Sequence, residues 1–160
     1  FTSPTINLFF KPTDYLKVAK NLKHYMTCEL IEYPDIDHEY PVGKLDDVII
    51  YFVHYASFHE AKEKWEERKK RINYNNLFFI FTERDGCNYE MIKEFENLPY
   101  KNKVVFTIKK YPEITSSICL PHTVINSEVR DLCSYKNLFT KQRWIDTFDY
   151  VAFLNTGEIK

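Results

Sequence analysis

Five side chains capable of acid–base, nucleophilic or anion-binding chemistry lie in two short segments of the sequence. His54 and Tyr55 end one apolar segment, and Arg84, Asp85 and Cys87 follow the next one. If both apolar segments are parallel strands of one sheet, their carboxyl ends share the edge at which open α/β sheets bind ligands. The sequence therefore predicts that these five side chains converge on one site.

His54 is the first candidate for catalysis. A neutral imidazole at the end of a buried strand can act as a base, an acid or an orienting donor near neutral pH. The alternative role is structural, with the imidazole hydrogen-bonded to a backbone carbonyl group. Its place at a predicted strand end is the observation that favours catalysis.

Cys87 is a candidate nucleophile. A thiol beside a helix N-terminus is shifted toward the thiolate by the helix dipole, and Arg84 would increase that shift. With His54 as base and Asp85 as orienting carboxylate, a Cys-His-Asp arrangement is an open alternative. In the structural interpretation Asp85 and Gly86 form a turn before the next helix.

Binding of an anionic or sugar-containing substrate is the second expected role of this site. Arg84 and Lys109 follow predicted strands and suit a phosphate or carboxylate group. Tyr55 and Tyr111 can stack on a sugar ring. The structural alternatives are a solvated lysine and tyrosines at the margin of the core.

Apolar segments alternate with helical patterns through the middle of the chain. The uninterrupted apolar run at residues 48–53 is typical of a strand buried on both faces, as in a parallel sheet. We predict an α/β fold, with a three-layer α/β/α arrangement and a mostly parallel central sheet. The main strands are expected at residues 46–55, 77–81 and 103–108, and the helices between them at residues 58–72 and 88–98.

Weaker patterns predict additional elements. Ser57 and Glu60 form a capping box at the start of the helix at 58–72. Arg68 interrupts the apolar face of that helix and is expected to extend to solvent or to pair with a carboxylate. Further strands are expected at residues 5–10, 28–33 and 116–120, and further helices from residue 13 and at residues 141–154.

Composition narrows the possible functions. The 160 residues favour a single domain at 1–160, and 22 basic against 23 acidic residues argue against a nucleic-acid-binding surface. The four cysteines form no Cys-x-x-Cys pair and the histidines have no paired spacing, so no metal site is expected.

The apolar runs are shorter than the roughly 20 residues that a membrane span needs. We therefore expect a cytoplasmic protein without transmembrane segments. Peripheral association with a membrane is compatible with this expectation. The sequence contains no dinucleotide-binding Gly-x-Gly-x-x-Gly motif, no P-loop motif and no Gly-x-Ser-x-Gly nucleophile elbow of the hydrolases. It therefore identifies no cofactor.

Seven ordered segments carry a family resemblance: residues 40–47, 54–55, 60–73, 84–87, 95–99, 103–107 and 111–112. They resemble the DUF1919 family of bacterial proteins, usually described as exopolysaccharide or capsule biosynthesis proteins. The resemblance implies an enzyme that modifies, or transfers onto, a polysaccharide precursor. Its expected partner is a carbohydrate or a nucleotide-activated sugar. It includes His54, Arg84 and Asp85 as candidate site residues. The alternatives are a non-catalytic carbohydrate-binding or assembly partner and, more weakly, a Cys-dependent hydrolase or acyltransferase.

The family pattern also contains an upstream Asn-Asn-Cys element, ahead of the strand at residues 5–10. The numbered chain does not contain that element. We expect either that the natural protein has an additional N-terminal segment or that this member has lost it. In the first case, the upstream cysteine competes with Cys87 for the role of nucleophile.

Overall fold

The computed structural model describes residues 3–5, 7–34, 37–121, 124–137 and 139–159. The chain divides into two compact units, Phe1–Asn76 and Leu77–Lys160, which are described separately. The described residues contain no helix that is long and apolar enough to cross a membrane.

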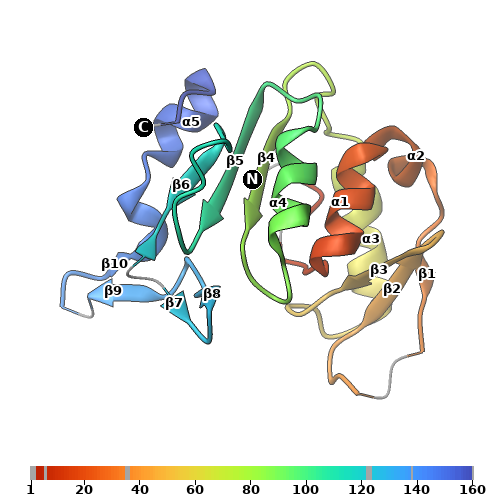
Figure 1. The fold of residues 1–160 in the computed structure, drawn as a ribbon. Helices are drawn as coiled ribbons and strands as arrows, with labels where there is room; N and C mark the ends of the chain where they lie inside the picture. Colours follow the sequence, from red (N-terminus) through yellow and green to blue (C-terminus); the bar gives the residue numbers. More distant parts are fainter. Residues whose placement is uncertain (1–2, 6, 35–36, 122–123, 138, 160) are drawn as a thin grey trace. The chain divides into compact units, whose positions relative to one another are not determined.

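The N-terminal unit combines helices with a three-stranded antiparallel sheet of order β1-β2-β3 (Figure 1). Its core includes Leu16 of the first helix, Trp65 of the third helix and Phe52 after the last strand, all of them almost fully buried. The elements are α1 (Pro12–Lys20), α2 (Leu22–Thr27), β1 (Ile31–Glu32), β2 (Val42–Leu45), β3 (Val48–Tyr51) and α3 (Phe58–Lys69).

The predicted parallel strand at residues 46–55 is wrong in direction and length. It corresponds to β3, which pairs antiparallel with β2 from Val42↔Tyr51 to Leu45↔Val48. The short connection through Asp46, which has a φ of 53°, allows the chain to reverse directly, and antiparallel pairing needs no crossover helix. On its other side β3 is bridged by Phe9, the part of the predicted strand at 5–10 that the structure pairs.

Helix α3 begins where the sequence predicts. The hydroxyl of Ser57 accepts a hydrogen bond from the backbone N–H of Glu60 at 3.2 Å, which satisfies a free donor of the first turn. The helix ends at Lys69, before the expected residue 72. Arg68 donates from Nη1 to the hydroxyl of Tyr55 at 2.6 Å, a partner that the sequence does not predict.

The C-terminal unit contains the parallel sheet, of order β4-β5-β6, and α4 connects its first two strands along the chain (Figure 1). Asn88 caps α4 by accepting from the backbone N–H of Met91 at 3.0 Å. Phe81 stacks on Phe95 of α4, whereas Phe106 is buried against Phe148. This confirms the predicted strand–helix–strand unit. The elements are β4 (Phe78–Thr82), α4 (Tyr89–Glu96), β5 (Asn102–Thr107) and β6 (Ser117–Cys119).

The end of the chain is less helical than predicted. The single helix expected at residues 141–154 is replaced by a strand, a 3₁₀ turn and a shorter helix. Asp149 accepts from the backbone N–H of Ala152 at 2.8 Å and so starts a new helix at Tyr150. The elements are β7 (Val124–Ile125), β8 (Glu128–Val129), β9 (Tyr135–Asn137), β10 (Gln142–Arg143), η2 (Trp144–Thr147) and α5 (Tyr150–Thr156).

Helices and strands are therefore mixed, as predicted, but the strands form separate small sheets. The three-stranded sheet of the C-terminal unit is parallel, and that of the N-terminal unit is antiparallel. The prediction of a single, mostly parallel central sheet is not confirmed. β3 belongs to the antiparallel sheet and β4 to the parallel one.

Candidate functional site

The carboxyl ends of β4 and β5 are joined by a buried carboxylate, that of Glu83, which is 6% exposed. The backbone N–H of Glu83 donates to the Phe106 carbonyl at 2.9 Å, continuing the sheet by one residue. Its carboxylate accepts from the Ile108 N–H and from the Tyr111 hydroxyl, each at 2.8 Å. Burial of this charge is thus compensated by donors from the segment that follows β5.

The loop after Glu83 is a tight turn. The N–H of Cys87 donates to the carbonyl of Arg84 at 3.1 Å, and the intervening Asp85 and Gly86 have φ values of 56° and 81°. Positive φ at both central residues is what a type I′ turn requires. The turn predicted at Asp85 and Gly86 is therefore confirmed.

Glu128 fixes this turn from a distant part of the sequence. Its carboxylate accepts from the backbone N–H of Asp85 at 3.0 Å and of Gly86 at 2.8 Å. The bonds from Gly86 and Asp85 lower the pKa of Glu128. Glu83 and Glu128 were not predicted as site residues, because neither belongs to a recognisable motif.

Arg84 and Asp85 form an ion pair with each other. Arg84 Nε lies 2.9 Å from Asp85 Oδ2, and both side chains are partly exposed. The Asp85 carboxylate is thus held beside a guanidinium group in this structure. The expected pairing of Asp85 with His54 remains a prediction, because His54 belongs to the N-terminal unit.

Cys87 lies beside the start of α4 but does not have the expected thiolate character. Burial raises the pKa of its thiol to about 12, and the negative charges of Glu83 and Glu128 add to the effect. Burial, with the two carboxylates as a smaller cause, therefore opposes the shift toward the thiolate that the prediction expected from the helix dipole. Catalysis by Cys87 would need a base to remove the proton.

Lys109 and Tyr111 lie together at this edge of the sheet. The Tyr111 ring stacks on Tyr89, with centroids 5.1 Å apart, and the Lys109 ammonium group is 5.3 Å from the Tyr111 ring centroid. Tyr111 is 9% exposed, and its hydroxyl is bonded to Glu83. These contacts fit the structural alternative for Tyr111, and a role in sugar stacking stays a prediction.

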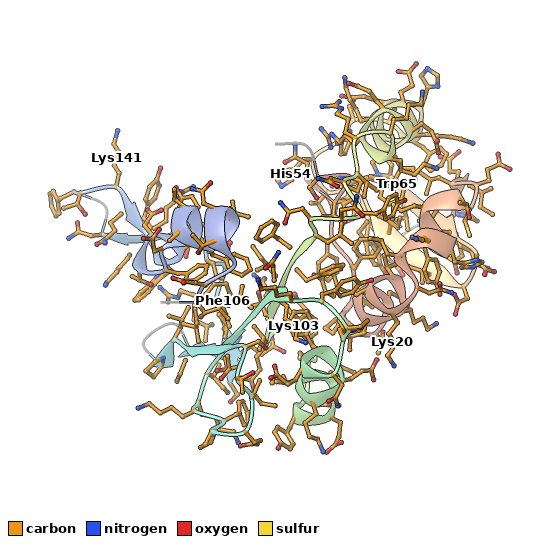
Figure 2. All side chains as sticks on the ribbon, turned by 90° about the horizontal axis from the view of Figure 1, so that it is seen from above. Lys20, His54, Trp65, Lys103, Phe106 and Lys141 are labelled. Carbon is orange, nitrogen blue, oxygen red and sulfur yellow. The ribbon has the colours of Figure 1, made fainter. Side chains whose placement is uncertain are left out.

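The N-terminal unit holds the other two predicted residues. His54 is exposed in the turn after β3, and Figure 2 labels it. Tyr55 is half-buried and accepts the hydrogen bond from Arg68. The predicted residues thus form two groups, with Arg84, Asp85, Cys87, Lys109 and Tyr111 in one unit and His54 and Tyr55 in the other.

An open pocket of about 610 Å³ lies in the N-terminal unit and was not predicted. Its lining includes the aromatic side chains of Tyr33, Tyr40 and Phe58 and the acidic side chains of Glu32 and Glu39. The segment immediately after His54 and Tyr55 also contributes to the wall. The sequence gives little sign of this pocket, because its walls come from an irregular segment and from the start of α3.

Comparison with known proteins identifies the family. A family described as "Domain of unknown function (DUF1919)" matches residues 1–155. The chain belongs to the DUF1919 family. This DUF1919 chain is also 39% identical over 155 residues to an uncharacterized protein of Haemophilus influenzae, with 97% of this chain and 74% of that protein covered. Both the pocket and the carboxyl edge of the parallel sheet therefore lie within the DUF1919 match.

Proposed function

We propose that this protein is an enzyme that modifies, or transfers onto, a carbohydrate precursor of a surface polysaccharide. The observation that carries the proposal is the pocket lined by Tyr33, Tyr40 and Phe58 together with Glu32 and Glu39. Its volume of about 610 Å³ falls within the range of about 300–1,000 Å³ that is usual for small-molecule sites.

The lining chemistry supports a sugar ligand. Aromatic rings offer flat apolar faces to the C–H face of a sugar ring, and carboxylates accept hydrogen bonds from hydroxyl groups. Tyr33 is 42% exposed, so its side chain is accessible to a ligand. The charges of Glu32 and Glu39 disfavour a phosphate at the same place, so the pocket is assigned to the sugar part of a nucleotide-activated or lipid-linked precursor.

His54 supplies the acid–base group in this proposal. It is exposed and precedes Ala56 and Ser57, which line the pocket. A second candidate function is carbohydrate binding without catalysis. That alternative is favoured by the fact that no hydrogen bond or ion pair joins His54 to an orienting carboxylate among the described residues of its unit.

The test incubates purified full-length protein with nucleotide-activated sugars and lipid-linked acceptors, and measures both product formation and binding of neutral oligosaccharides. We expect product formation, loss of binding in Tyr33→Ala, and loss of product with retained binding in His54→Ala. Tyr135→Ala is the matched control, because Tyr135 is 53% exposed and lies in the other unit. Binding without any product would favour the non-catalytic alternative, and failure of Tyr33→Ala to weaken binding would refute the assignment of the pocket.

A further inference from the structure

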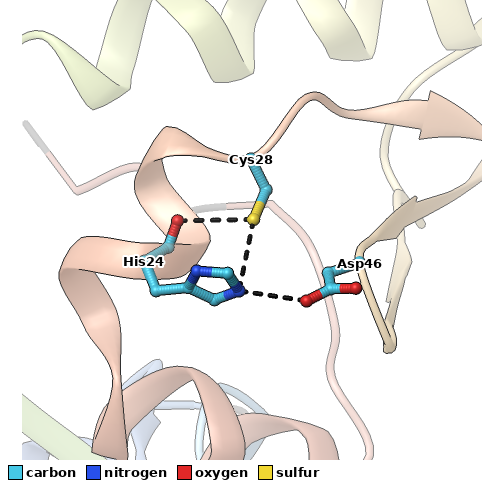
Figure 3. Close-up of side chains that lie close together, drawn as sticks. All are labelled: His24, Cys28 and Asp46. Atoms are coloured by element: carbon cyan, nitrogen blue, oxygen red, sulfur yellow. Dashed lines mark hydrogen bonds and ion pairs between the residues drawn. The ribbon is translucent and has the colours of Figure 1, made fainter.

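Three side chains with metal-binding chemistry lie together in the N-terminal unit, and none of them lines the pocket. They are His24 of α2, Cys28 at the end of α2, and Asp46 between β2 and β3 (Figure 3). One ligand atom from each side chain lies within 4.8 Å of the other two. Among the described residues, this is the group of three or more His, Cys, Asp or Glu side chains whose ligand atoms all lie within that distance of one another.

Local structure explains why these side chains meet. His24 and Cys28 are four residues apart, so the end of a helix brings them to the same face. The Cys28 N–H donates to the His24 carbonyl at 3.2 Å, which fixes this last turn. Asp46 is fixed through its neighbour Asp47, whose carboxylate accepts from the Tyr25 hydroxyl and from the Lys17 ammonium group, each at 2.7 Å.

Two of the distances within this group are close to those between neighbouring ligand atoms of a metal ion. His24 Nε2 lies 3.0 Å from Asp46 Oδ2 and 3.6 Å from Cys28 Sγ. Tetrahedral zinc has bonds of about 2.0–2.3 Å to nitrogen, oxygen and sulfur, which places neighbouring ligand atoms roughly 3.3–3.6 Å apart. The Cys28 sulfur and the Asp46 carboxylate oxygen lie within 4.8 Å of each other, and they would approach to roughly 3.5 Å when all three atoms bind one ion.

The same geometry argues against a catalytic triad. In a triad the histidine uses one ring nitrogen toward the nucleophile and the other toward the carboxylate. Here the Cys28 sulfur and the Asp46 carboxylate both approach Nε2 of His24. Three ligand atoms that lie within 4.8 Å of one another are instead a grouping that a single metal ion can bridge.

We propose that His24, Cys28 and Asp46 form a binding site for a divalent transition metal ion, with Zn²⁺ as the expected ion. An imidazole, a thiolate and a carboxylate are all zinc ligands, and water would complete the tetrahedron because His24 and Asp46 are exposed. On binding, the S–H bond of Cys28 breaks, a metal–sulfur bond forms, and the proton passes to solvent. The ion would link the end of α2 to the β2–β3 turn.

The test titrates the full-length protein, stripped of metal with a chelator, with Co²⁺ and follows the thiolate-to-cobalt charge-transfer absorption. We expect saturation at one equivalent and displacement of Co²⁺ by one equivalent of Zn²⁺. Cys28→Ser should abolish the charge-transfer band, whereas Asp46→Asn should retain it and weaken affinity at least about tenfold. Cys133→Ser is the control, because Cys133 is exposed and lies in the other unit.

A second variant keeps the test decisive if Cys28→Ser does not fold. His24→Gln retains the thiol and changes an exposed side chain, and it should weaken Co²⁺ binding at least about tenfold with an unchanged circular dichroism spectrum. The absence of a charge-transfer band in the native protein would overturn the proposal. A band that disappears in Cys133→Ser but not in Cys28→Ser, or unchanged affinity in His24→Gln, would overturn it equally.

Discussion

The buried carboxylate of Glu83 accepts a hydrogen bond from the hydroxyl of Tyr111 at 2.8 Å. This bond connects the end of β4 to the segment after β5, and it is accompanied by the bond from the Ile108 N–H to the same carboxylate. The carboxyl edge of the parallel sheet is thus organised around one buried charge. The stability of this edge of the sheet should therefore depend on the hydrogen-bond donors around the Glu83 carboxylate.

Tyr111→Phe should destabilise the protein by about 1–3 kcal/mol, because it leaves a buried carboxylate with one donor fewer. The free energy of unfolding measured in urea tests this prediction. Tyr135→Phe, at an exposed position, should leave the same quantity unchanged. Equal stabilities of Tyr111→Phe and the native protein would show that the bond contributes nothing net.

Cys87 should react slowly with iodoacetamide at neutral pH, because burial and the nearby charges of Glu83 and Glu128 raise the pKa of its thiol to about 12. Peptide mapping after timed labelling should find exposed Cys133 modified first. The labelling rate of Cys87 should still be increasing above pH 9. A plateau near neutral pH would instead indicate the activated thiolate expected from the helix dipole.

Tyr25 should make stability depend on pH in the alkaline range. Burial, together with the hydrogen bond to Asp47, raises its pKa from 10.0 to about 12 in the folded protein. Because the folded pKa is the higher one, this contribution is complete below about pH 10 and is lost as the pH increases to about 12. The free energy of unfolding of Tyr25→Phe should therefore fall less steeply than that of the native protein over this interval. Parallel curves would contradict the assignment.

Gly43→Ala should destabilise the N-terminal unit by overpacking. A Cβ atom at this position in β2 would lie 2.8 Å from Leu30 Cδ1 and 3.0 Å from Phe52 Cε2, both in nearly fully buried side chains. We expect a loss of about 1–3 kcal/mol in the free energy of unfolding. Restoration of stability by an additional Leu30→Val substitution would identify the clash as the cause, and no loss in Gly43→Ala would exclude it.

Gly86→Ala should be destabilising for a different reason. No atom lies within 4 Å of the position of a new Cβ, but the φ of 81° is unfavourable for alanine. The expected cost is about 1–2 kcal/mol, and Gly86→Asn should cost less, because asparagine tolerates this conformation. Thermal denaturation of the two variants tests this order, and a reversal would show that backbone strain is not the cause.

Local features of this protein could be predicted from its sequence. The cap at Ser57, the turn at Asp85 and Gly86, and the strand–helix–strand unit through β4, α4 and β5 all depend on residues that are close in the chain. Caps, turns and apolar periodicity are determined by neighbouring residues, so the predicted positions of these elements are close to the observed ones. The family resemblance was likewise carried by short ordered segments.

Tertiary structure decided which strands pair and which charges meet. The apolar sequence of β3 fits a parallel or an antiparallel partner equally well, and only its pairing with β2 fixed the choice. The pKa of Cys87 depends partly on Glu128, and the side-chain cluster around His24 includes Asp46, each brought close by folding. Such contacts join residues that are distant in the chain. They are stabilised by packing and electrostatic interactions, which a short sequence pattern does not contain.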